Sequence, residues 1–230
     1  MLDLRWTIPV ARWSCLAAGA TVAPDVKFID PLVRRRLSSL SKMALQVAHD
    51  CVSDLESVRL VFASRHGELR RTTSMLDDIV GNQPVSPTAF SLSVLNAMTG
   101  VYGIARGDRS PATAISAGAE TLGYALLEAH AQFSADPSTP VLVVYADEPA
   151  DARYGEIDHE MPSGALAILL DRDAPAELEC AAGPALDAQG APAFATQGEA
   201  LMHGLGARAA TVWQGLGRRW HWSLRSCGAQ

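Results

Sequence analysis

Hydrophobic and polar positions divide the chain into short apolar runs and longer stretches with helical spacing. Residues 57–64 (SVRLVFAS), 140–146 (PVLVVYA) and 163–171 (SGALAILLD) are compact apolar runs. Such runs, which lack alternation, are typical of strands buried on both faces of a sheet. Residues 4–23 mix apolar and polar positions in rough alternation, which predicts one or two further strands.

Helical spacing fills much of the sequence between these runs. Residues 31–55 carry one apolar stripe at three- and four-residue intervals, and Pro31 suits the first turn of a helix. Residues 69–80 and 90–106 are also predicted to be helices. Because strands alternate with helices, we expect an α/β fold with three layers, in which helices cover both faces of a mixed sheet.

Residues 110–133 (SPATAISAGAETLGYALLEAHAQF) predict a strand, a sharp turn and a helix at the centre of the chain. The β-branched residues of 113–116 favour a strand, and Ala117, Gly118 and Ala119 are small enough for a tight turn. Several enzyme families hold a nucleophile on such an elbow, because the turn exposes one side chain at a helix N-terminus.

The last quarter of the sequence is less regular. No repeat or linker divides the chain before about residue 172, so residues 1–171 are predicted to form one domain. Residues 172–230 are interpreted as an extension rich in Ala, Pro and Gly, with little periodicity in its first half. Trp213, Leu216 and Trp220 follow at helical spacing and predict a last helix within residues 203–222.

Composition limits the classes of protein. The 230 residues are 48% hydrophobic and carry a net charge of −6. Without a basic block, nucleic acid is not expected as a partner, and without an apolar run of about 18 residues, no membrane span is expected. Cys15, Cys51, Cys180 and Cys227 lie far apart, which indicates free thiols in a reducing, cytoplasmic location rather than a metal site. No cofactor is expected either.

Lysines are few, and their positions limit the possible chemistry. Lys27 and Lys42 are the only lysines, so a lysine-dependent mechanism would have to use the first quarter of the chain. The run Arg34, Arg35 and Arg36 is interpreted as a solvated face, with a docking site as the alternative.

Four fragments in order carry a resemblance to a known family. They are residues 34–45 (RRRLSSLSKMAL), 62–68 (FASRHGE), 86–98 (SPTAFSLSVLNAM) and 105–114 (ARGDRSPATA). The chain resembles the N-terminal half of a β-ketoacyl synthase, over roughly residues 31–171, and is most similar to the short synthase-like subunits of aryl-polyene-type gene clusters. Those subunits pair with a full-length ketosynthase and are treated as chain-length factors. The resemblance implies a thiolase-like α/β/α half with a mixed sheet.

The resemblance also implies that this chain has lost the family's chemistry. Counting onward from Ser86, the nucleophilic cysteine of the family falls on Ala119, and no cysteine lies between Cys51 and Cys180. The family's two histidines and lysine come from a second half, which the residues after 171 are too few to provide. We therefore expect a non-catalytic partner subunit.

Further implications concern the partner, a full-length ketosynthase in a heterodimer. The strand at residues 112–117 would pair with its counterpart across a two-fold axis, so an interface is expected at the following residues: Ser93, Asn96, Thr113, Ile115 and Ala117. The helix after the first core strand would wall the partner's acyl tunnel, which makes tunnel candidates of the following residues: His66, Leu69, Thr72 and Thr73. An acyl carrier protein would be met through the partner.

Three alternatives remain open. In a serine hydrolase, Ser116 on the A-x-S-x-G elbow would be the nucleophile, with Asp147 as the acid and His159 or His203 as the base. In a decarboxylase or priming factor, Glu120 would act beside Ala119, although a role as partner for the helix dipole is the preferred explanation of this glutamate. In a purely structural subunit, the chain would only stabilise the synthase.

Overall fold

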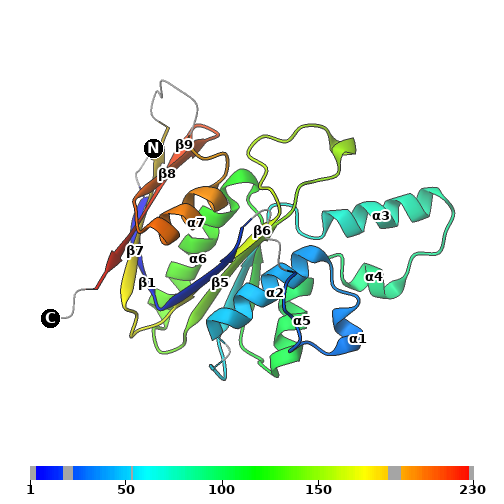
Figure 1. Cartoon of the computed structure of the whole chain (residues 1–230), viewed down its shortest axis with the longest axis horizontal. Coiled ribbons are helices and arrows are strands. Elements are labelled where there is room, and N and C mark those ends of the chain that lie inside the picture. Colours follow the sequence, from blue (N-terminus) through cyan, green and yellow to red (C-terminus); the bar gives the residue numbers. More distant parts are fainter. Residues whose placement is uncertain (1–3, 18–22, 53, 186–192, 228–230) are drawn as a thin grey trace.

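The computed structural model describes residues 4–17, 23–52, 54–185 and 193–227, and it contains two sheets with helices between and beside them (Figure 1). The larger sheet has five strands in the order β2-β6-β5-β3-β4. Its strands are β2 (Arg12–Leu16), β6 (Gly164–Leu170), β5 (Val141–Asp147), β3 (Arg59–Ala63) and β4 (Ala112–Ile115). β3 pairs in parallel with β4 and β5, while β6 pairs antiparallel with β5 and β2, so the predicted mixed sheet is confirmed.

Helices cover both faces of the five-stranded sheet. Alternate residues of its central strands point to opposite faces, and both sets are buried, which explains why these strands lack alternation in the sequence. One face packs against α2 (Ser39–Val52) and α5 (Ala97–Arg106), and the other packs against α6 (Thr121–Ala135) and α7 (Gln197–Ala207). The short α1 (Pro31–Arg34) precedes α2.

Two predicted helices are each broken in the structure. The helix expected over residues 31–55 is divided into α1 and α2, because Asp30 caps the first and the Ser38 hydroxyl accepts a hydrogen bond from the Ser41 N–H at the start of the second. The helix expected over residues 90–106 is divided into α4 (Pro87–Ser91) and α5. Between these two, serine hydroxyls donate to nearby backbone carbonyl groups and compete with the helical pattern.

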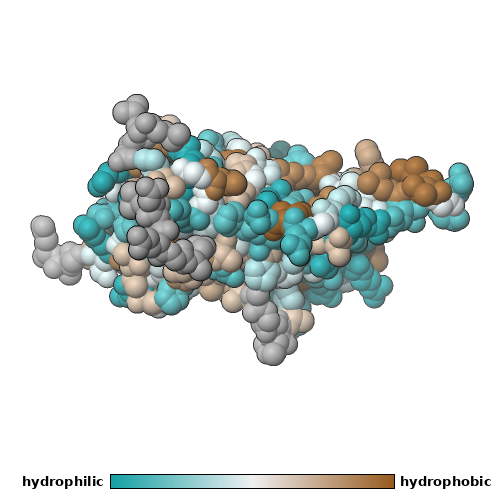
Figure 2. Space-filling model, turned by 90° about the horizontal axis from the view of Figure 1, so that it is seen from above, coloured by the Kyte–Doolittle hydropathy of each residue, from teal (hydrophilic) through white to brown (hydrophobic). Residues whose placement is uncertain are grey.

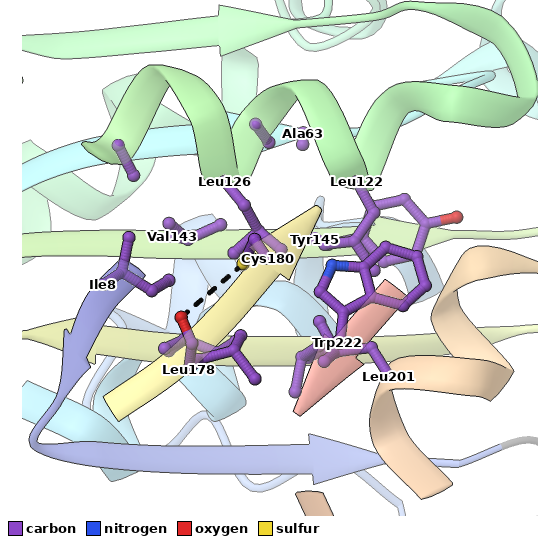
Figure 3. Close-up of a cluster of buried hydrophobic side chains, with 14 of the residues drawn as sticks. Ile8, Ala63, Leu122, Leu126, Val143, Tyr145, Leu178, Cys180, Leu201 and Trp222 are labelled. Atoms are coloured by element: carbon purple, nitrogen blue, oxygen red, sulfur yellow. Dashed lines mark hydrogen bonds between the residues drawn. The ribbon is translucent and has the colours of Figure 1, made fainter. Parts of the chain in front are cut away.

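A second sheet was not predicted. Its four strands run in the order β1-β7-β9-β8 and are all antiparallel. They are β1 (Leu4–Val10), β7 (Ala176–Pro184), β9 (Arg218–Ser226) and β8 (Thr211–Gly215). Its inner face packs against α6 and α7, and Figure 3 shows side chains of α6, β5 and β7 gathered in one cluster there.

The prediction of a last helix within residues 203–222 is therefore wrong. α7 begins with a capping box between Thr196 and Glu199 and ends where Arg208 adopts a left-handed conformation. The chain then forms the β8–β9 hairpin, whose turn places Leu216 and Gly217 at φ of 52° and 75°. Two successive positive φ angles are typical of the tight turns that match strand twist.

The division of the chain at residue 171 stays a prediction. β1, from the first predicted segment, pairs with β7, from the second, and both contribute to the core around α6. None of the helices in the described ranges has the length and apolar character needed to cross a membrane.

Candidate functional site

The elbow between β4 and α6 has the predicted strand–turn–helix form. Gly118 has φ of 60°, the left-handed region that favours glycine. The Thr121 hydroxyl closes the turn, since it accepts from the Ala117 N–H at 2.9 Å and donates to the Gly118 carbonyl oxygen at 2.7 Å. Ala119 lies in the short 3₁₀ turn before α6 and is half-buried against the core. The side chain at this position is a methyl group, and its assignment to the expected nucleophile position stays a prediction.

A buried carboxylate fixes the neighbouring strand end. Asp147 closes β5 with 1% of its surface exposed, and it accepts hydrogen bonds from the N–H groups of Arg65 and His66 at 2.9 and 3.2 Å. The hydroxyl groups of Ser64 and Tyr145 also donate to it. Burial raises the pKa of Asp147, and these donors oppose that change. Asp147 thus holds the backbone that enters α3 (Leu69–Val80).

The residues of the predicted hydrolase triad have separate partners. Ser116 is exposed just after β4, and its hydroxyl donates to the Arg65 carbonyl oxygen at 2.9 Å. His159 contacts a backbone carbonyl oxygen and a tryptophan ring of the second sheet, while His203 packs against Phe194. Because Asp147 already holds backbone N–H groups, the structure does not assemble the triad.

The C-terminal hairpin packs directly on the first turns of α6. Trp220 is fully buried, and its indole N–H donates to Glu120 Oε1 at 2.7 Å. Arg218 Nε lies 3.4 Å from the same oxygen. A Cβ atom on Gly123 would lie 2.4 Å from the Trp220 ring, so only glycine allows this approach. Glu120 is thus engaged by an indole and a guanidinium group, which the sequence interpretation as a dipole partner or acid did not foresee.

The four tunnel candidates gather at the start of α3. His66 Nε2 lies 3.0 Å from Glu160 Oε1, and the Thr73 hydroxyl lies 2.9 Å from the Tyr154 hydroxyl. His66 and Thr73 therefore contact the connection between β5 and β6 of their own chain. Leu69 and Thr72 are half-buried on the first turns of the helix. Their role as a tunnel wall stays a prediction.

β4 is an open edge, since β3 is the only strand in the described part of the chain that pairs with it. The N–H groups of Leu60 and Ser64 donate to the carbonyl oxygens of Pro111 and Ile115, both at 3.1 Å. Because strand peptides alternate in direction, the backbone groups of the intervening residue Ala114 face away from β3. A strand that added to this edge would meet these unpaired groups.

Three of the five interface candidates, Thr113, Ile115 and Ser93, have side chains engaged within the chain. Thr113 Oγ1 accepts from Gln132 of α6, and Ile115 packs against the core on that side. The Ala117 N–H donates to Thr121, and the Ser93 hydroxyl donates to the Phe90 carbonyl oxygen of α4. Asn96 is exposed just before α5. Contact through β4 would consequently use backbone groups more than these side chains, and the interface assignment stays a prediction.

Comparison with known proteins identifies the family. The family model for the N-terminal domain of β-ketoacyl synthase matches residues 10–223. The chain belongs to this family. Among proteins with curated functions, no sequence matches it.

Solved ketosynthase structures share the fold of this family member. A chain of the complex of the ketosynthase ApeO with its chain length factor ApeC, from Xenorhabdus doucetiae, matches with a TM-score of 0.78 and 25% identity, over 95% of this chain and 99% of that chain. The ishigamide ketosynthase/chain length factor matches with a TM-score of 0.57 and 16% identity, over 75% of this chain and 65% of that chain. A β-ketoacyl synthase from Burkholderia phymatum STM815 matches with a TM-score of 0.52 and 12% identity, over 75% of this chain and 54% of that chain. The predicted thiolase-like fold is confirmed.

One surface of this synthase-family chain was missed in the sequence. α3 and α4 project from the sheet, and apolar side chains on them are exposed: Leu76 (50%), Ile79 (57%) and Val80 (84%) on α3, and Phe90 (64%) on α4. Figure 1 shows the projection, and Figure 2 shows hydrophobic surface on its α3 side. The apolar residues of α3 were visible in the sequence, but a helical stripe usually faces the protein's own core.

Metal ligands are not grouped in the part of the chain that the structure describes. There, no cluster of three or more histidine, cysteine, aspartate or glutamate side chains could hold an ion. All four cysteines are free, and burial raises the pKa of Cys51 to about 12, so this thiol remains protonated. The expectation that the chain uses no metal or cofactor stays a prediction.

Proposed function

We propose that this chain is a non-catalytic, chain-length-factor-like subunit that pairs with a full-length β-ketoacyl-ACP synthase. The observation that carries the proposal is the open edge of β4, which leaves backbone hydrogen-bonding groups for a second subunit beside the elbow. The likeness to a chain of the ApeO–ApeC complex, over nearly all of both chains, supports the same assignment.

The elbow supports a subunit that does no chemistry itself. Condensation in this family needs a thiolate at the elbow, and Ala119 has no group that can attack an acyl thioester. Glu120, the nearest ionisable side chain in sequence, is held by Trp220 and Arg218. This engagement favours a filled, structural elbow over a decarboxylase that would use Glu120.

The projecting α3 supports a role in shaping the partner's acyl tunnel. Its exposed apolar side chains Leu76, Ile79 and Val80 would be covered in a heterodimer, whereas in the free chain they contact water. Leu69 and Thr72, on the first turns of the same helix, would limit the space for the growing chain. Products of the polyene or fatty acid type, an acyl carrier protein met through the partner and a cytoplasmic location complete the proposal.

Product profiling of the reconstituted pair tests the tunnel role. Leu69→Trp adds several heavy atoms at the wall, and inserted bulk in a packed site costs about 1–3 kcal/mol. Only acyl chains that are long enough to reach the tunnel wall experience this cost. We therefore expect shorter products at a similar total turnover.

Ser74→Trp is the matched control, because Ser74 is an exposed residue on another side of α3. Mass spectrometry of the products should show the shift for Leu69→Trp alone. A profile that is unchanged, in complexes that still form, would contradict the tunnel role and leave the purely structural subunit. An equal relative decrease in the amounts of products of all acyl-chain lengths would favour the structural subunit as well.

A further inference from the structure

A cavity of about 780 Å³ lies where the end of β2 meets the start of α2. Four cationic side chains line it, namely Arg34 and Arg35 after the first turn of α1, Lys42 of α2 and Arg70 of α3. None of the elbow residues or the strand β4 contributes to its wall. The cavity is therefore separate from the β4 edge and the elbow, although Arg70 of its wall belongs to α3.

The chain balances the charges in this cavity only in part, since Arg70 lies near Glu148, and since the pKa of Asp25 is lowered by Lys27 and, from beyond ion-pair distance, by Arg34. Among the described residues, Arg34, Arg35 and Lys42 have no carboxylate within ion-pair distance and make no side-chain hydrogen bond. Glu148 is the only carboxylate in the wall, and its Oε2 lies 4.0 Å from Arg70 Nε. Cations that converge without partners repel one another, and in a protein of net charge −6 this arrangement indicates an anionic ligand.

The rest of the cavity wall is largely apolar, so part of the ligand should be apolar as well. Leu16, Val26 and Met43 line the same cavity, and Val26 is buried with the core beside α2. The hydroxyl of Ser39 adds a neutral donor near the cationic side. A ligand that fills the cavity must therefore present a compact anion at one end and hydrocarbon at the other.

We propose that this cavity binds a small phosphate monoester with a hydrocarbon arm. Arginine presents a planar fork of donors that matches phosphate oxygens, and lysine adds a point charge. The phosphate group would lie among Arg34, Arg35 and Lys42, and the arm would lie against Val26 and Met43. The run of arginines, interpreted from the sequence as a solvated face, thus gains a binding role at two of its three positions.

Titration calorimetry with n-hexyl phosphate tests the site on the full chain, alone and in complex with the synthase. We expect saturable 1:1 binding in both, weaker binding of inorganic phosphate, and none of n-hexanol at the same concentration. The double variant Arg34→Gln, Lys42→Gln should lose roughly tenfold or more in affinity, because each change removes a charge-assisted contact. Met43→Ser should weaken the binding of n-hexyl phosphate but leave the binding of inorganic phosphate unchanged.

Arg36→Gln is the matched control, since Arg36 belongs to the same run but does not line the cavity. It removes one charge from the same segment and should change the affinity by less than about twofold. Absence of saturable binding would overturn the proposal. An equal loss in Arg36→Gln would also overturn it, because that result indicates only long-range attraction. Circular dichroism of each variant separates loss of binding from loss of folding, and the result does not depend on whether the chain pairs with a synthase.

Discussion

Replacing Ala114 by proline tests whether the open edge of β4 pairs with the synthase. The Ala114 N–H faces away from β3, so proline removes a group that the folded chain does not use internally. The hydrogen bonds to the Pro111 and Ile115 carbonyl oxygens remain available to β3. The residue before a proline prefers the extended conformation, which Thr113 already has in the strand.

The cost of this change falls on the interface. In the proposed heterodimer, the partner carbonyl oxygen that would accept from the Ala114 N–H stays buried but loses its donor. A buried acceptor left without a donor costs about 1–3 kcal/mol of binding free energy. Each 1.4 kcal/mol is a factor of ten, so the dissociation constant should rise by about 5- to 140-fold. The free energy of unfolding of the isolated chain should change by less than about 1 kcal/mol, because no internal strand hydrogen bond is lost.

Surface plasmon resonance with the immobilised synthase gives the dissociation constant, and urea unfolding gives the stability. Ala114→Ser is the control, because it keeps the N–H at the same position and should bind as the parent does. An Ala114→Pro variant that folds normally and binds the synthase with unchanged affinity would refute strand pairing at this edge.

Further predictions concern the elbow. Trp220→Ala should lower the free energy of unfolding by about 3–5 kcal/mol in urea, because it opens a cavity against α6 and leaves Glu120 without its indole donor; a loss below about 1 kcal/mol would contradict the packing described. Ala119→Cys should not create condensing activity in a radiolabelled acyl-transfer assay of the chain alone, because the hairpin covers the first turns of α6 and no histidine is among the hydrogen-bond partners of the elbow. Ser116→Ala should leave the assembled enzyme active, since the hydroxyl only donates to a backbone carbonyl group; a loss of several orders of magnitude in an intact complex would revive the hydrolase.

The sequence predicted those elements whose local pattern and tertiary environment agree. The helix at Leu69–Val80 has the predicted bounds, the buried strands β3 and β6 lie within the apolar runs that indicated them, and β5 extends one residue beyond its run to Asp147. In these segments the hydrophobic pattern, the turn residues and the final burial favour the same structure. The breaks after α1 and α4 were missed because hydrophobic spacing does not show local side-chain-to-backbone hydrogen bonds such as those of Ser38 at the start of α2 and Ser93 after α4.

The second sheet was missed although two of its strands alternate in the sequence over four or five residues. Trp213 and Trp220 are seven residues apart, which suits a helix, but the structure pairs them directly across the β8–β9 hairpin. In β7, Leu178 and Cys180 alternate with Glu177 and Glu179, but Ala181 and Ala182 end this pattern after four residues. The alternation in these segments was outweighed by the helical spacing of the tryptophans and by the Ala-, Pro- and Gly-rich composition around β7.

The candidate site was predictable in position but not in its contacts. The elbow lies where the sequence placed it, with Ala119 before α6. The partners of Glu120 and Asp147 come from residues about 100 and 80 positions away in the sequence, so no local pattern could reveal them. The exposed apolar side chains of α3 were visible, but only the fold shows that no other part of the described chain covers them.

Co-expression of this chain with a full-length ketosynthase, followed by size-exclusion chromatography with light scattering, tests the central claim most directly. We predict a stable 1:1 complex, whereas the chain alone should self-associate or be poorly soluble because the edge of β4 and the apolar side of α3 are uncovered. A well-behaved monomer that does not change its mass when the synthase is added would contradict the proposed function.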